Sequence, residues 1–198
     1  MSDWIIPLIA TGLSGIVTGS LAFASAVDTR SFLLHLSSSS ASSEDQDEEE
    51  KKAADDDDGA TGLIVKHFQV WWPCGRDWMV PLIGTTTLAN LAAWFVASRS
   101  AGGSSSATAS PSTWCWGAAA TMIGLIGPYT GFVLMEDIDK LRTSSTEEVE
   151  VTTRRFCNLH HPRLGMALVG YGFALFGLAS TKGLSGQGGG DRTPYITV

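Results

Sequence analysis

The stretch WMVPLIGTTTLANLAAWFVAS, residues 78–98, contains no charged side chain and has the length that a helix needs to cross the hydrocarbon core of a bilayer. Three further uncharged stretches of similar length cover residues 4–27, 114–135 and 164–181. The hydrocarbon core offers no water to backbone N–H and C=O groups, so such stretches can cross it only as helices. The sequence therefore predicts an all-α, integral membrane four-helix bundle that forms a single four-span domain over residues 1–198.

The net charge of −7 arises from one segment of the chain. Ten of the twenty acidic residues lie within residues 44–58, and with Lys51 and Lys52 this tract carries −8, which leaves +1 for the rest of the chain. Residues 37–60 contain no apolar residue larger than alanine, so we predict a disordered acidic insertion in the first loop. We expect the Gly-rich residues 182–198 to form a flexible tail.

The distribution of basic residues predicts the orientation of the spans. Four spans place both termini on one side and the first and third loops on the other. Those two loops hold most of the basic residues, and the opposite side holds only Arg99, Lys182 and Arg192. The positive-inside rule then predicts that loops one and three are cytosolic. We expect a multi-pass protein of the endomembranes that is in contact with the lipid bilayer.

Local signals suggest where the first two helices begin and end. Asp28 and Arg30 are expected to end the first helix. Residues 63–72 place apolar side chains at helical spacing, which predicts a short amphipathic segment on the membrane surface before the second helix. Pro81 is expected in the first turn of the second helix, where its missing N–H costs little.

Prolines and glycines mark the third and fourth helices. Pro128 lies between Gly127 and Gly131 and is expected to kink the third helix, and Pro162 is expected to bend the chain into the fourth. Small residues at short spacing let membrane helices approach closely. We therefore predict close helix packing at the glycines of the first, third and fourth helices: Gly15, Gly19, Gly127, Gly131, Gly165, Gly170, Gly172 and Gly177.

The sequence lacks the patterns of the common cofactor and metal sites. The three cysteines, Cys74, Cys115 and Cys157, form no CxxC pair, which argues against a thiol–disulfide oxidoreductase. The four histidines lie outside the uncharged stretches, which argues against haem ligation within the spans. No GxGxxG or GxxxxGK[ST] motif occurs. We predict no cofactor, no metal and no nucleic-acid partner.

Polar residues inside a span are costly and therefore informative. Threonine hydroxyls can donate to a carbonyl one turn earlier in their own helix, so we expect most of the threonines to be satisfied in this way. Asn90 cannot do so as easily, and we favour a hydrogen bond to another helix over a ligand contact for it.

Two short stretches carry a resemblance to a known family. Pro128-Tyr129-Thr130, with the apolar run and the polar residues 136–141 that follow, resembles the third-helix signature of the anthrone oxygenase family of small four-span membrane proteins. Lys140 and Leu141 fit that signature, whereas Glu136, Asp137 and Ile138 stand where members often have Pro-Thr-Asn. The stretch Phe156-x-x-Leu159-His160-x-x-Arg163 resembles the family pattern Trp-x-x-Leu-Asn-x-x-Arg, with Phe156 and His160 as departures. The resemblance covers most of the chain except residues 37–60 and is closest to the fungal noranthrone monooxygenases.

The resemblance implies oxidation of a polyketide anthrone, such as norsolorinic acid anthrone or emodin anthrone, to its anthraquinone by O₂ without a cofactor. Such a site needs a base, a partner for the anthrolate oxygen and an apolar slot for a planar tricycle. We assign the base to His160 or His161 and the oxyanion partner to Arg163. We expect the remaining contacts with the substrate to come from three groups of residues. They are aromatic side chains that form the walls (Trp71, Trp72, Trp78), hydrogen-bonding side chains (Asn90, Tyr129, Thr130) and charged side chains at the rim (Arg76, Asp77).

The alternative is a non-catalytic tetraspan scaffold or assembly protein. Claudin-like proteins of this size carry a cysteine pair in the first loop, and here only Cys74 lies there. A small transporter is disfavoured because no carboxylate lies within the spans. A homo-oligomer is compatible with either function.

Overall fold

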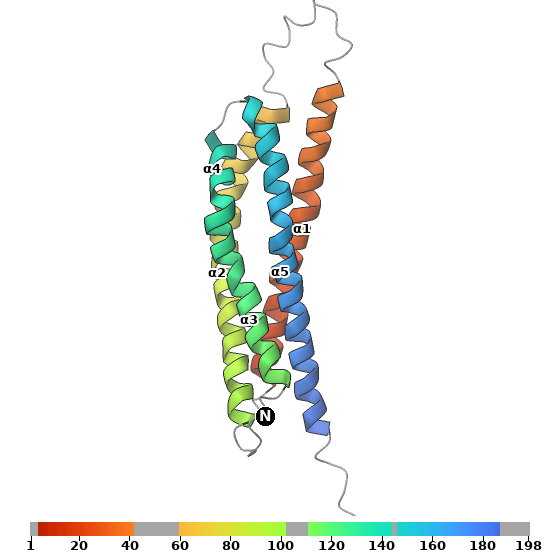
Figure 1. Ribbon diagram of the computed structural model, residues 1–198, viewed down its shortest axis with the longest axis vertical. Coiled ribbons are helices and arrows are strands. Elements are labelled where there is room, and N and C mark those ends of the chain that lie inside the picture. The colour runs from red at the N-terminus through yellow and green to blue at the C-terminus, as the bar shows by residue number, and fades with distance from the viewer. Residues whose placement is uncertain (1–3, 42–59, 102–110, 144–145, 187–198) are drawn as a thin grey trace, which may run out of the picture.

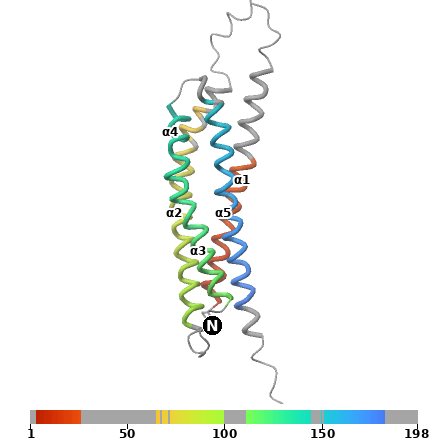
Figure 2. Tube along the Cα trace, viewed as in Figure 1, coloured from red at the N-terminus to blue at the C-terminus, as the bar shows by residue number. Residues whose placement is uncertain are grey.

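The computed structural model describes residues 4–41, 60–101, 111–143 and 146–186, and helices account for nearly all of them (Figure 1). The helices are α1 (Ile5–Ala41), α2 (Ala60–Ala101), α3 (Pro111–Tyr129), the π-helix η3 (Thr130–Leu134), α4 (Met135–Thr143) and α5 (Thr146–Gly186). Figure 2 shows α3, η3 and α4 running on as one column. The bundle therefore has four long members, which confirms the predicted all-α four-helix architecture.

Each member of the bundle packs against two neighbours. α1 and α3 each pack against both α2 and α5, so the four members close into a ring. Neighbours in sequence run in opposite directions, as in an up-down-up-down bundle. The C-terminal end of α1, the N-terminal end of α2 and the α4–α5 junction meet at one end of the bundle (Figure 1). We call this the loop end.

Four helical stretches are long and apolar enough to cross a membrane: Ile5–Ala26, Trp72–Arg99, Pro111–Thr143 and Val151–Thr181. Large apolar side chains cover their outer faces, including Phe132 at 89% exposure and Trp114 at 72%. Exposing so many apolar side chains to water would be unfavourable, whereas lipid tails can surround them without that cost. The chain is a multi-pass membrane protein.

The interior contains three layers of buried side chains along the bundle axis. The first layer consists of Ala10, Ala93, Trp116, Ala119 and Ala174. The middle layer consists of Val17, Leu21, Ile83, Ile123, Ile126 and Ala167. The third layer, toward the loop end, consists of Phe68, Trp72, Leu134, Ile138, Leu141, Val149 and Phe156.

Close packing is found at three of the eight predicted glycines: Gly15, Gly170 and Gly177. The prediction was wrong for the other five, because a Cβ would meet no atom within 4 Å at Gly19, Gly127, Gly131, Gly165 or Gly172. A Cβ built on Gly15 would lie 3.3 Å from the Tyr171 ring, and one on Gly170 would lie 2.8 Å from Ile123. A side chain at position 170 would therefore displace Ile123, whereas one at position 15 would require the Tyr171 ring to move by a few tenths of an ångström. The threonine prediction is confirmed as well, because Thr hydroxyls donate to carbonyls one turn earlier in α1, α2, α3 and η3.

The first helix is longer than predicted. Asp28 and Arg30 do not end it, because α1 continues to Ala41 and includes residues 37–41 of the predicted insertion. A charge ends a membrane span without ending a helix, since backbone hydrogen bonding continues beyond the hydrocarbon core. The rest of the insertion, residues 42–59, lies outside the described residues. The first residues of the predicted flexible tail, 182–186, are helical, because α5 extends to Gly186. The rest of that predicted tail, residues 187–198, lies outside the described residues.

The prediction of a surface segment before the second helix was wrong. Residues 63–72 belong to the first turns of α2, and Pro73 lies inside this helix. Pro81 also lies inside it and not in its first turn as predicted, because α2 already begins at Ala60. Phe68 and Trp72 are 1% and 7% exposed because α4 and α5 extend far enough to cover them as part of the third layer. The apolar pattern of residues 63–72 shows which face of the helix is buried, but it does not show whether a membrane surface or other helices cover that face.

The two remaining prolines also lie within helices. Pro162 does not separate two elements, because α5 continues through it from Thr146. After Pro128 the chain forms η3, a π-helix, at the place where a kink was predicted. Neighbouring helices and local π adjustments satisfy the backbone groups that a proline frees in a membrane bundle.

Candidate functional site

A cavity of about 590 Å³ lies between the middle and third layers of the core. Its volume falls within the roughly 300–1,000 Å³ of typical small-molecule sites. Leu21 and Ile83 of the middle layer and Trp72 and Phe156 of the third layer form part of the wall, which is mainly apolar. The polar side chains in the wall are Ser20, Arg76, Thr130, Cys157, His160 and Arg163.

Glycines create much of the empty space. Gly19, Gly127 and Gly131 line the cavity, and a Cβ built on any of them meets no atom within 4 Å. At Gly177, by contrast, a Cβ would lie 2.9 Å from Trp116. The prediction that the Gly127/Gly131 pair serves close packing is therefore wrong. These glycines leave room for a ligand instead.

His160 places a buried imidazole in the cavity wall. The residue is 6% exposed, and its ring centroid lies 5.9 Å from that of Phe156. The ring approaches the backbone of Leu21, but neither ring nitrogen has a partner in hydrogen-bonding geometry among the described residues. An unsatisfied buried polar group costs free energy, so a ligand that forms a hydrogen bond with the imidazole would recover that cost.

Arg163 lies one turn after His160 on the same face of α5. It is 5% exposed, and its Nε has no hydrogen-bond partner. In the described part of the chain no carboxylate lies within ion-pair distance of this guanidinium, although other arginines do form such pairs. A buried cation without a counter-ion is strongly unfavourable in an apolar bundle. The cavity is thus suited to an anion or to a group that becomes anionic.

The π-helix η3 shapes the part of the wall beside α5. π-turns inside α-helices are often found at functional sites, because they change which side chains face inward. Here η3 contributes Thr130 and Gly131 to the cavity. The Thr130 hydroxyl donates to the Ile126 carbonyl at 2.7 Å and keeps its oxygen lone pairs for accepting a hydrogen bond.

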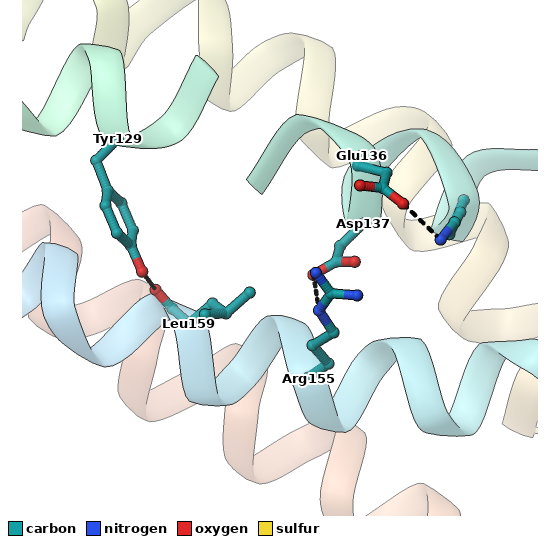
Figure 3. Close-up of polar contacts among 6 residues, drawn as sticks. Tyr129, Glu136, Asp137, Arg155 and Leu159 are labelled. Atoms are coloured by element: carbon teal, nitrogen blue, oxygen red, sulfur yellow. Dashed lines mark hydrogen bonds and ion pairs between the residues drawn. The ribbon is translucent and has the colours of Figure 1, made fainter. Parts of the chain in front are cut away.

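Two polar contacts hold the column of α3, η3 and α4 against α5 on either side of η3 (Figure 3). The Tyr129 hydroxyl donates to the carbonyl of Leu159 at 2.9 Å, one residue before His160. Arg155 Nε lies 3.3 Å from a carboxylate oxygen of the buried Asp137. Tyr129 does not line the cavity, so its place is behind the wall, where it fixes the backbone at His160.

Arg76 extends the cavity toward its rim. It is an exposed wall residue, and its guanidinium pairs with the exposed Asp77 at 3.0 Å. Trp78 is 80% exposed and lies outside the wall, as does Asp77. The predicted rim charges therefore lie together, whereas Trp78 faces away from the bundle.

The other predicted site residues differ in whether they line the cavity. His161 is exposed and does not line the cavity, so the structure separates it from His160. Trp72 is a buried wall residue. The backbone of Trp71 belongs to α2, but its side chain is not among those that the structure describes. Of the predicted set, Trp72, Arg76, Thr130, His160 and Arg163 converge.

Asn90 lies away from the cavity and connects two helices. Its amide nitrogen donates to Ser14 Oγ at 3.0 Å and to the Thr86 carbonyl at 2.8 Å. The side chain is fully buried and does not line the cavity. The bond between helices agrees with the interpretation favoured from sequence.

Asn90→Leu should therefore lower stability and leave ligand binding unchanged. Hydrogen bonds between membrane helices contribute about 0.6 kcal/mol on average and up to about 1.7 kcal/mol. We expect a loss within that range in reversible unfolding from detergent or lipid. Ser14→Ala should cause a similar loss, and the double variant should lose less than the sum of the two. Strictly additive losses would contradict the coupling of the two side chains.

Several residues of the cavity wall were not predicted from the sequence. Gly19, Met79 and Cys157 line the cavity from three different helices. Nothing in their local pattern distinguishes them from neighbours that face lipid, because the cavity depends on how far apart the helices stand. For Cys157 the only signal was its position next to Phe156 in the motif that ends at Arg163.

Within the described residues, no three His, Cys, Asp or Glu side chains lie close enough to hold a metal ion. No known protein family, curated protein or solved structure matches this chain.

Proposed function

We propose that this chain is a cofactor-independent oxygenase that converts a polyketide anthrone to its anthraquinone with O₂. The observation that carries the proposal is the pair of buried side chains His160 and Arg163 in one mainly apolar cavity of about 590 Å³, where neither ring nitrogen of His160 nor Arg163 Nε has a hydrogen-bond partner among the described residues. A base and a cation without their own partners are the two groups that formation of an anthrolate anion requires. The short sequence motif ending at Arg163 supports the same assignment.

The proposed reaction consumes one O₂ per anthrone. A base removes a proton from the methylene carbon, which is acidic because it is flanked by two aryl rings and conjugated to the ring ketone. The anthrolate transfers an electron to O₂, and recombination forms a carbon–oxygen bond, which gives a hydroperoxide once the proton returns. Loss of water from the hydroperoxide leaves the second carbonyl. The sum is anthrone plus O₂ giving anthraquinone plus water.

The roles follow from position in the cavity. His160 accepts the methylene proton at a ring nitrogen and returns it to the peroxide. Arg163 stabilises the anthrolate oxygen in a site of low dielectric, where a charge interaction is strong. Trp72 and Phe156 hold the planar rings, and Thr130 accepts a hydrogen bond from a ring hydroxyl. The related motif has Asn at position 160, so the role of His160 rests on the geometry of the cavity.

The cavity lies toward the loop end of the bundle, where the first and third loops attach. Under the positive-inside rule this end faces the cytosol, so we propose an endomembrane protein whose cavity lies near the cytosolic face. A polyketide released by a soluble synthase would reach the cavity from that side.

The test is anthrone oxidation by the purified full chain in proteoliposomes. We expect quinone formation above the spontaneous rate of matched empty liposomes, one O₂ consumed per quinone, and one ¹⁸O atom from ¹⁸O₂ in each quinone. The rate should survive dialysis against chelator and the absence of nicotinamides. No excess rate with anthrone and 1,8-dihydroxyanthrone, from a preparation shown to be folded, would contradict the proposal and favour the scaffold function.

A further inference from the structure

The cavity is open to the outside of the bundle on the side of α1 and α2. The wall residues Leu21, Trp72, Ile83, Phe156, Cys157, His160 and Arg163 are buried. Phe23, Val80 and Arg76, by contrast, are wall residues with exposed side chains, at 70% and 63% exposure for the first two. Phe23 belongs to α1, whereas Arg76 and Val80 belong to α2, and these helices are neighbours in the ring. We call these three residues the mouth.

The mouth lies within the depth of the bilayer. Phe23 is part of the candidate span Ile5–Ala26, and Val80 is part of Trp72–Arg99. Both side chains are apolar and point outward, as do the lipid-facing residues elsewhere on the bundle. A ligand that passes between them leaves a hydrocarbon environment, not water.

The mouth is polar at one edge. Arg76 lies one turn before Val80 on α2 and therefore about 6 Å nearer the loop end. Its long side chain can keep the charge near the headgroups while its methylene groups line the cavity. Inside, Arg163 offers a second cation close to the middle layer, because Ala167 of that layer follows it by one turn. The path thus runs from an apolar surface with the Arg76 guanidinium at its edge to the Arg163 guanidinium, which has no carboxylate within ion-pair distance in the part of the chain that the structure describes.

We infer that ligands reach this cavity laterally from the bilayer, through the mouth formed by Phe23, Val80 and Arg76. The geometry selects planar amphiphiles whose apolar body dissolves in the membrane and whose acidic hydroxyl or enol group can interact with Arg163. The inference concerns the same cavity as the proposed function but requires no oxidation step.

Two glycines of α1 provide a matched test. Gly12 and Gly19 are seven residues apart and so lie on the same face; both are exposed, and a Cβ on either meets no atom within 4 Å. Only Gly19 lines the cavity, beside the mouth. A leucine at Gly19 narrows the passage, and a leucine at Gly12 only adds lipid-facing surface.

The measurement is stopped-flow quenching of tryptophan fluorescence by 1,8-dihydroxyanthraquinone in proteoliposomes, with Trp72 as the cavity reporter. We expect Gly19→Leu to slow association about tenfold, because a leucine beside the mouth narrows the passage, and to raise Kd as well, because the same side chain takes up part of the cavity. Gly12→Leu should leave both the association and the dissociation rate unchanged. Phe23→Ala should speed both rates.

A second readout locates the passage. In a background without the native cysteines, Gly19→Cys should react with a lipid-soluble maleimide, and bound 1,8-dihydroxyanthraquinone should block the reaction. Gly12→Cys should react without being blocked. Unchanged rates in Gly19→Leu, or equal reactivity of both cysteines with and without the quinone, would overturn lateral access. A chain that binds the quinone through the mouth but does not oxidise anthrones would instead contradict only the proposed function.

Discussion

Arg163→Met is expected to lower the rate of anthrone oxidation by roughly 10²–10³-fold, the usual effect of removing one group that stabilises a developing oxyanion. Methionine fills a similar volume and keeps the wall apolar, so the cavity is retained. The loss should appear mainly in kcat, because the charge on the anthrolate oxygen develops after the neutral substrate binds.

The same substitution is expected to raise stability. Arg163 is 5% exposed and has no counter-ion among the described residues, so the ligand-free protein bears the cost of a buried charge. Replacing it with an apolar side chain should increase the free energy of unfolding by about 1 kcal/mol or more, which for a chain of this size is roughly 2–4 °C in Tm. A gain in stability with a loss of activity is the usual sign of a group kept for function.

Arg99→Gln is the matched control. Arg99 is also an arginine of a long helix, but it stacks on the Phe95 ring at 4.2 Å and lies on α2 far from the cavity. We expect it to change oxidation less than twofold. Full turnover in Arg163→Met would remove Arg163 from the reaction, and a drop in Tm would show that it has a partner in the folded protein.

The fold was predictable because the bilayer leaves few alternatives. An uncharged stretch such as residues 78–98 can satisfy its backbone within hydrocarbon only as a helix, whatever its neighbours do. Helix ends were less predictable, because a charge such as Asp28 ends the apolar span but not the backbone hydrogen bonding. α2 illustrates the same limit: Phe68 and Trp72 became core residues because α4 and α5 extend beside them.

The candidate site was partly predictable for a different reason. His160 and Arg163 lie one turn apart in a single helix, so a motif in the sequence is enough to place them together. Thr130, Trp72 and Arg76 join them only because four helices stand around a space that glycines leave open. Sequence spacing cannot distinguish a glycine that permits contact, such as Gly170, from one that leaves a cavity, such as Gly131. Which residues line the cavity therefore depends on how the four helices are placed in the assembled bundle.

The adjacent histidines offer the sharpest test of the chemistry. His160→Gln should lower the oxidation rate by about 10²–10⁴-fold, the range for loss of a positioned general base, whereas His161→Gln should leave it within about twofold. Glutamine approximates the size and polarity of the imidazole but has no basic nitrogen, so the cavity and its hydration change little.

The contrast between the two variants follows from their places on α5. His160 is 6% exposed and lies in the wall, where neither ring nitrogen has a partner in hydrogen-bonding geometry among the described residues, and His161 is exposed outside the wall. Initial rates of quinone formation should be measured for both variants in the same lipid, and binding of 1,8-dihydroxyanthraquinone should be measured in parallel. Near-normal binding with lost turnover in His160→Gln identifies the base. Equal rates for the two variants would show that proton removal does not depend on His160 and would contradict its assignment as the base.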